Sequence, residues 1–125
     1  MEAVKEARRY VENARELLKD KARKREGYYQ DQKYVKMAGN TAYNGILVAL
    51  DSLLDDKVKG RKDVKWYKSR LARLDKKVLS SYTAAYDTLH LALGYDGNPL
   101  ASVASAGLKE AEKIIDWVER RSVVA

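Results

Sequence analysis

The sequence has no cysteine, no phenylalanine, one proline and one histidine among its 125 residues. Without cysteine the chain can form no disulfide framework, thiolate metal site or thiol nucleophile. The lone histidine, His90, cannot supply a histidine-cluster metal site. No apolar run approaches the roughly 18 residues that a membrane span requires, and the first residues lack the apolar segment of a signal peptide. We therefore expect a cytoplasmic protein with no metal, no cofactor and no membrane partner.

Apolar residues make up 46% of the sequence and charged residues 34%, which is enough to close a core without falling into the disordered class. The length suits one domain, so we expect residues 1–125 to form a single unit. Apolar side chains recur at the spacing of one helix face in four segments. The predicted helices span about residues 2–25, 31–55, 63–93 and 100–121. Short connections between them predict an all-α fold, an antiparallel up-down four-helix bundle.

The predicted helix ends depend on residues with special backbone preferences. Gly27 is the expected C-cap of the first helix, because glycine adopts the left-handed conformation at little cost. Asp63 is the expected N-cap of the third helix, whose apolar stripe continues to Leu93 without a break. The segment 94–99 combines glycine, proline and turn formers, so the chain should reverse there.

The second predicted helix is apolar around most of its circumference and should be the most buried. Gly39 and Gly45 lie on a side of small residues, where a neighbouring helix can approach closely. Asn40, Asn44 and Asp51 form a narrow polar strip on the same helix. The simplest interpretation of that strip is exposure to solvent.

The net charge is +7, and the positive charge is concentrated between residues 57 and 77. Only two acidic residues, Asp63 and Asp75, accompany the basic ones in this stretch. Most of the cations project opposite the apolar stripe, and Trp66 lies at the centre of their arc. Lysine and arginine neutralise phosphates, and an indole stacks on an unpaired base. The residues predicted to contact nucleic acid are Lys62, Lys65, Trp66, Arg70, Arg73, Lys76 and Lys77.

Two other interpretations of this surface stay open. It can be a solvated charged face, with Trp66 folded onto the end of a neighbouring helix. It can also be a contact within a homo-oligomer, most simply a dimer, because tryptophan and arginine are frequent interface anchors. Trp117 is a second candidate anchor, although its place at the edge of an apolar stripe favours the core. The candidate partners are therefore RNA or another polyanion, and a second copy of the chain.

His90 lies near the end of the third predicted helix, close to Tyr95, Asp96 and Asn98. An imidazole titrates near neutrality, so beside a carboxylate and a phenol it can do general acid–base work. These four residues are the candidate catalytic group. A hydrogen bond from His90 to Asp96 or Asn98 would instead tie down the turn, and this structural role is the one we expect.

Three strings carry a resemblance to a known family: EARRYVENA at 6–14, AYNGILVAL at 42–50 and LHLALGYDGN at 89–98. Together they resemble an uncharacterised bacterial family, a domain of unknown function, that looks like a HEPN-type helical bundle. The resemblance implies a HEPN-like four-helix fold and a dimer. Many HEPN domains are metal-independent RNases, whose motif is an arginine followed after four to six residues by a histidine.

The sequence departs from that catalytic motif. His90 is present, but Thr83, Ala84 and Ala85 stand where the arginine would lie. The cation that would stabilise the developing phosphorane charge is therefore missing locally. We expect a non-enzymatic binding or interaction module, with RNA binding through the basic surface. A homo-oligomeric module without nucleic acid and an RNase that uses His90 are the two alternatives.

Overall fold

The computed structural model describes residues 1–54 and 62–124, and the fold is all-α apart from one short hairpin. Its helices and strands are α1 (Glu2–Glu16), the π-helical η1 (Leu17–Lys21), β1 (Lys24–Arg25), β2 (Tyr28–Tyr29), α2 (Gln32–Leu54), α3 (Val64–Leu74), α4 (Lys76–Ala85), the π-helical η2 (Tyr86–Tyr95) and α5 (Ala101–Val124). The predicted all-α class is confirmed. Residues 55–61, which include most of a predicted turn and the basic residues Lys57, Lys59 and Arg61, lie outside the described residues, as does Ala125.

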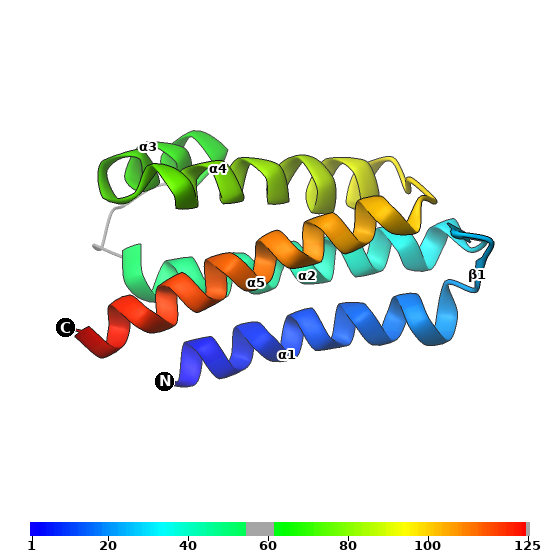
Figure 1. Ribbon diagram of the computed structural model, residues 1–125, viewed down its shortest axis with the longest axis horizontal. Coiled ribbons are helices and arrows are strands. Elements are labelled where there is room, and N and C mark those ends of the chain that lie inside the picture. Colours follow the sequence, from blue (N-terminus) through cyan, green and yellow to red (C-terminus); the bar gives the residue numbers. More distant parts are fainter. Residues whose placement is uncertain (55–61, 125) are drawn as a thin grey trace.

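The long helices lie side by side along the longest axis of the molecule (Figure 1). α1 packs on α2, α2 packs on η2 and α5, and α4 packs on α5. α3 lies beside the start of α4, at the end where both chain termini are found (Figure 1). The hairpin lies at the opposite end (Figure 1). Within the described residues, no helix has the length and apolar character needed to cross a membrane.

The core is built from the stripes that the sequence predicted. Val11 and Leu18 from the first stripe, Ile46 and Leu50 from the second, and Leu89 from the third are all buried. Every element that spans the molecule therefore buries one apolar face. The removal of this apolar surface from water is the main favourable contribution to the free energy of folding. Trp117 is only 5% exposed, so it belongs to the core.

The first helix ends earlier than predicted. It stops at Lys21, and Arg23 and Glu26 take positive φ angles of 55° and 52°. Gly27 is not a helix C-cap but part of the hairpin turn, with φ of 85°. The N–H of Tyr29 donates to the carbonyl of Pro99 at 2.7 Å, so the hairpin is fixed by contacts with a segment distant in sequence. Such partners are invisible to local periodicity, which explains the error.

The third helix is not continuous, because Asp75 interrupts it. The backbone of Asp75 is extended, with φ of −165° and ψ of 115°, and it separates α3 from α4. Its carboxylate accepts hydrogen bonds from the N–H groups of Lys77 (2.8 Å) and Val78 (3.3 Å), so Asp75 is the N-cap of a new helix. Leu74, which the pattern placed in the core stripe, is 42% exposed as a result. The apolar side chains keep the spacing of one helix face on both sides of Asp75. The sequence periodicity therefore gave no sign of the break.

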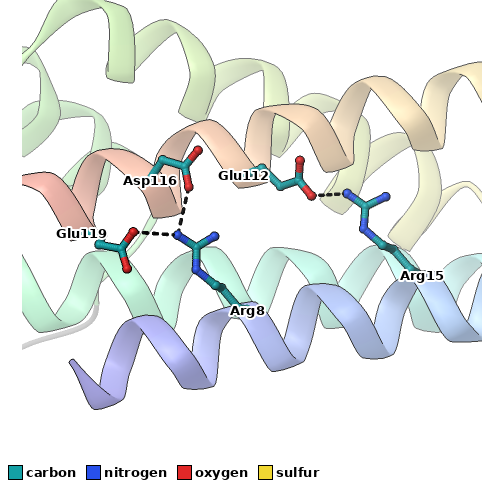
Figure 2. Close-up of polar contacts among 5 residues, drawn as sticks. All are labelled: Arg8, Arg15, Glu112, Asp116 and Glu119. Carbon is teal, nitrogen blue, oxygen red and sulfur yellow. Dashed lines mark hydrogen bonds and ion pairs between the residues drawn. The ribbon is translucent and has the colours of Figure 1, made fainter.

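Ion pairs connect the first and last helices along one edge (Figure 2). Arg8 donates to Asp116 at 2.9 Å and to Glu119 at 3.1 Å, and Arg15 donates to Glu112. These side chains are partly exposed, so each pair adds little to stability, about 0–1 kcal/mol. The row of pairs mainly fixes how α1 lies against α5.

Candidate functional site

The predicted nucleic-acid contacts gather on α3 and the first turn of α4. We call this surface the basic ridge; it consists of Lys62, Lys65, Trp66, Arg70, Arg73, Lys76 and Lys77. The break at Asp75 divides it between two helices, whereas the sequence placed it on one straight helix. The ridge lies at the end of the molecule that carries the chain termini (Figure 1).

The two acidic residues of the ridge segment are used as helix caps. Asp63 accepts a hydrogen bond from the N–H of Trp66 at 2.9 Å, and Asp75 caps α4. Partial desolvation raises the pKa of Asp75, but hydrogen bonds from Val78, Lys77 and Trp117 outweigh it and hold the pKa below its ordinary value. Both carboxylates thus serve the backbone. Within the described residues, Lys65, Arg73 and Lys76 make no ion pair within 4.0 Å.

Three lysines of the ridge stand where a helix favours negative charge. Lys65 is in the first turn of α3, and Lys76 and Lys77 begin α4. The N-terminus of a helix carries a partial positive charge, so a cation there costs about 0.3–1 kcal/mol. The placement of these three lysines therefore weakens the two helices locally.

Trp66 is less exposed than its position on the predicted arc suggested. The indole is half-buried against the core, with the Tyr67 ring edge-on at 5.0 Å. Lys62 Nζ and Arg70 Cζ each lie 5.2 Å from the centre of the Trp66 ring. The ring is thus an anchor for two cations of the ridge, in a cation–π arrangement.

Asp51 connects the ridge to the core, a role that the sequence did not reveal. Its carboxylate accepts a hydrogen bond from the hydroxyl of Tyr67 at 2.6 Å, and Lys62 Nζ lies 3.7 Å from the same oxygen. The predicted exposure of the polar strip on α2 is confirmed for Asn40 and Asn44, whereas Asp51 is partly buried. Asn40 also donates to the carbonyl of Gly94 at 3.2 Å. An acidic residue directly after the apolar run 46–50 was the available signal for Asp51.

His90 lies in the π-helix η2, and aromatic rings pack against its imidazole. Its ring centre lies 4.9 Å from that of Tyr43 and 5.2 Å from that of Tyr86. His90 Nδ1 is buried, and within the described residues it has no hydrogen-bond partner. π-Helical segments are rare in proteins, and those that occur often lie at functional sites. The rings beside His90 belong to the phenols of Tyr43 and Tyr86, and no hydrogen bond between His90 and a carboxylate is found among the described residues.

The turn residues predicted to assist His90 have other partners. Tyr95 is 77% exposed. The carbonyl of Asp96 accepts a hydrogen bond from Gln32 Nε2 at 3.1 Å, and Asn98 Oδ1 accepts one from the N–H of Leu100 at 3.0 Å. The expected hydrogen bond from His90 to Asp96 or Asn98 is not among those that the described residues form. The structure thus does not bring the four candidate catalytic residues together through hydrogen bonds.

Comparison with known proteins places the chain in a family. Residues 2–120 match the family DUF5618, which is described as a domain of unknown function. This chain belongs to the DUF5618 family. A solved structure described as a protein of unknown function from Dyadobacter fermentans is similar to this DUF5618 member, with 57% identity, a TM-score of 0.93 and 96% of each chain covered. No curated protein matches the sequence. In the described part of this DUF5618 domain, no three His, Cys, Asp or Glu side chains could together hold a metal ion.

Proposed function

We propose that this DUF5618 protein is a non-enzymatic, HEPN-like four-helix bundle that binds RNA in the cytoplasm through the basic ridge. The proposal rests on one combination of observations. Three cations of the ridge have no ion-pair partner among the described residues, and both acidic residues of the segment are helix caps. Lys65, Arg73 and Lys76 have no carboxylate within 4.0 Å among the described residues, so their charge is available to phosphates. Binding to phosphates tolerates many sequences and is strongly salt-dependent.

Trp66 contributes to this proposal by holding neighbouring cations in place. A guanidinium plane on an aromatic ring presents a flat surface on which an unpaired base can stack. Arg70, positioned 5.2 Å from the ring centre, is suited to that role. The half-buried indole itself offers less stacking area than an exposed one. We therefore assign phosphate contacts to the lysines and base contacts to the Arg70–Trp66 pair.

A non-enzymatic role agrees with the surroundings of His90. An RNase of HEPN type needs a cation near the histidine to stabilise the pentavalent phosphorus. Thr83, Ala84 and Ala85 carry no charge, and the rings beside His90 belong to Tyr43 and Tyr86. An imidazole between phenols that lacks an oriented carboxylate is better suited to packing than to proton transfer.

The alternative is a homodimer in which Trp66 anchors the interface. The partial exposure of Trp66 supports it, whereas Trp117 is buried and has Arg121 over its ring at 5.0 Å. Sedimentation of the wild-type protein and of Trp66→Ala without RNA separates the two proposals. A dimer that Trp66→Ala converts to monomer, without a change in RNA affinity, would favour the homodimer.

The RNA proposal predicts a salt-dependent affinity that the ridge cations control. Fluorescence anisotropy with a labelled single-stranded RNA, at two salt concentrations, should show tighter binding at low salt and no cleavage. The variant Lys65→Gln/Arg73→Gln/Lys76→Gln should lower the salt slope by about two units and weaken binding at low salt by at least about tenfold, because each lost phosphate contact removes about 0.7 from the slope.

The matched control is Lys5→Gln/Lys33→Gln/Lys109→Gln, which also removes three charges, from exposed positions on α1, α2 and α5. This control should bind RNA almost as the wild type does. Equal losses in both variants would mean a response to net charge alone, and absence of binding at low salt would reject RNA as the partner. Cleavage that disappears in His90→Ala would reject the non-enzymatic role.

A further inference from the structure

A groove of about 710 Å³ lies between the end of the first helix and the start of the last one. Leu18 and Lys19 of η1, Lys24 and Tyr29 of the hairpin, and Ser105 of α5 line it. The hairpin lies at the end of the molecule opposite α3, so the groove is distant from the basic ridge (Figure 1).

The groove exists because the start of α5 carries small side chains. Ala101, Ser102, Ala104 and Ser105 face it, so α5 cannot fill the space beside η1. Further along the same edge, Arg15 reaches across to Glu112, and only a smaller pocket of about 170 Å³ lies there (Figure 2). The ion pair therefore limits the groove towards the middle of the molecule.

The lining combines positive charge, hydroxyl groups and an apolar surface. Lys19 and Lys24 supply the positive charge, whereas Arg15 is paired with Glu112, and among the described residues no aspartate or glutamate is part of the lining. Ser102, Ser105 and Tyr29 supply hydroxyl donors. The phenol of Tyr29 is protonated at neutral pH and can donate, and burial raises its pKa further above the ordinary value. The partly exposed Tyr29 ring and Ala101 supply the apolar surface, above a nearly buried floor of Leu18 and Leu108.

The hairpin holds Lys24 and Tyr29 at the groove in a strained conformation. Arg23 and Glu26 have positive φ angles although neither is glycine, and such conformations persist only where surrounding contacts enforce them. Those contacts are with the start of α5: the N–H of Ala101 donates to the carbonyl of Gly27 at 2.9 Å, and Tyr28 pairs with Leu100. Strain of this kind is concentrated at binding sites.

We propose that this groove binds a small molecule that carries a phosphate group on a flat apolar body. Lys19 and Lys24 would contact the phosphate, with Ser102 or Ser105 as further donors, and the flat apolar body would lie against the partly exposed Tyr29 ring. A dianion with three terminal oxygens can use several cations and hydroxyls at once, more than a single carboxylate can. The volume lies within the range of about 300–1,000 Å³ that small-molecule sites occupy.

Calorimetric titration of the full chain with 1-naphthyl phosphate tests the proposal. Inorganic phosphate lacks the apolar body and 1-naphthol lacks the anion, so both should bind at least about tenfold more weakly than 1-naphthyl phosphate. Amide chemical shifts of residues 101–108 and of Lys24 should change during the titration. Equal binding of 1-naphthol, or no binding of 1-naphthyl phosphate at millimolar concentration, would overturn the proposal.

Two variants and a matched control locate the site. Ser105→Trp places an indole in the groove and should abolish binding, whereas Ala106→Trp, at the next exposed position outside the lining, should bind as the wild type does. Lys24→Gln should weaken binding about fivefold or more through the loss of one charge. Binding that persists in Ser105→Trp and Lys24→Gln would refute the site. If Ser105→Trp fails to fold, Lys24→Gln against Lys5→Gln decides.

Discussion

Replacing Gly39 with alanine will destabilise the protein by about 3 kcal/mol, the upper part of the range for an overpacked core. A methyl group at this position would lie 2.4 Å from the carbonyl oxygen of Leu89, 2.6 Å from Leu93 Cβ and 2.7 Å from the N–H nitrogen of Gly94. Two of these atoms belong to the backbone of η2 and cannot move aside as a side-chain tip can. The gain in helix propensity, about 1 kcal/mol, does not offset this clash. Urea unfolding followed by circular dichroism measures the change.

The matched control is Asn44→Ala on the same helix. Asn44 is exposed, so its replacement should change the free energy of unfolding by less than about 0.7 kcal/mol, the size of the propensity term. A Gly39→Ala protein as stable as the wild type would show that η2 can move away from α2. Because Leu89 precedes His90, such a movement would also alter the NMR signals of the His90 ring.

Raising the pH above about 10 will destabilise the protein through two buried tyrosines, Tyr67 and Tyr82. Burial is the largest cause that raises the pKa of each phenol, and hydrogen bonding adds to it, with Tyr43 for Tyr82 and with Asp51 for Tyr67. In the unfolded chain the same phenols ionise near their ordinary pKa of 10.0. The folded state then binds more protons than the unfolded state, so stability is intact below about pH 10 and decreases as the pH rises.

The expected slope approaches about 1.4 kcal/mol per pH unit for each of these tyrosines once the phenols of the unfolded chain are ionised, above about pH 11. Urea unfolding between about pH 11 and about pH 12 measures it. Tyr67→Phe removes one ionising group and should reduce the slope by about 1.4 kcal/mol per unit. Tyr95→Phe, at an exposed phenol, should leave the slope unchanged. Comparison with this control also corrects for the ionisation of lysine and arginine, which is common to all variants. Equal slopes in the wild type and Tyr67→Phe would contradict the prediction.

The candidate site could be predicted from the sequence in part. The density of positive charge and the positions of Lys65, Arg73 and Lys76 around the helix are properties of the local sequence. The sequence therefore indicated the basic ridge. The partners of Trp66 and Asp51 depend on the approach of α3 to α2, which no local pattern encodes. The groove beside Lys24 depends on how the hairpin meets α5, so no local pattern in the sequence predicts the groove either.

The sequence by itself determined the all-α class, the buried face of each helix and the close approach at Gly39 and Gly45. All of these follow from a period of 3.6 residues and from side-chain size, which are read along the chain. Only the tertiary structure decided where the helices end. At Asp75 the carboxylate accepts hydrogen bonds from backbone N–H groups and so begins a new helix, while the apolar side chains keep their helical period. At Arg23 and Glu26 the backbone adopts an unfavourable conformation because contacts with Pro99 and Ala101 compensate for it, and contacts between distant segments exist only after the chain has folded.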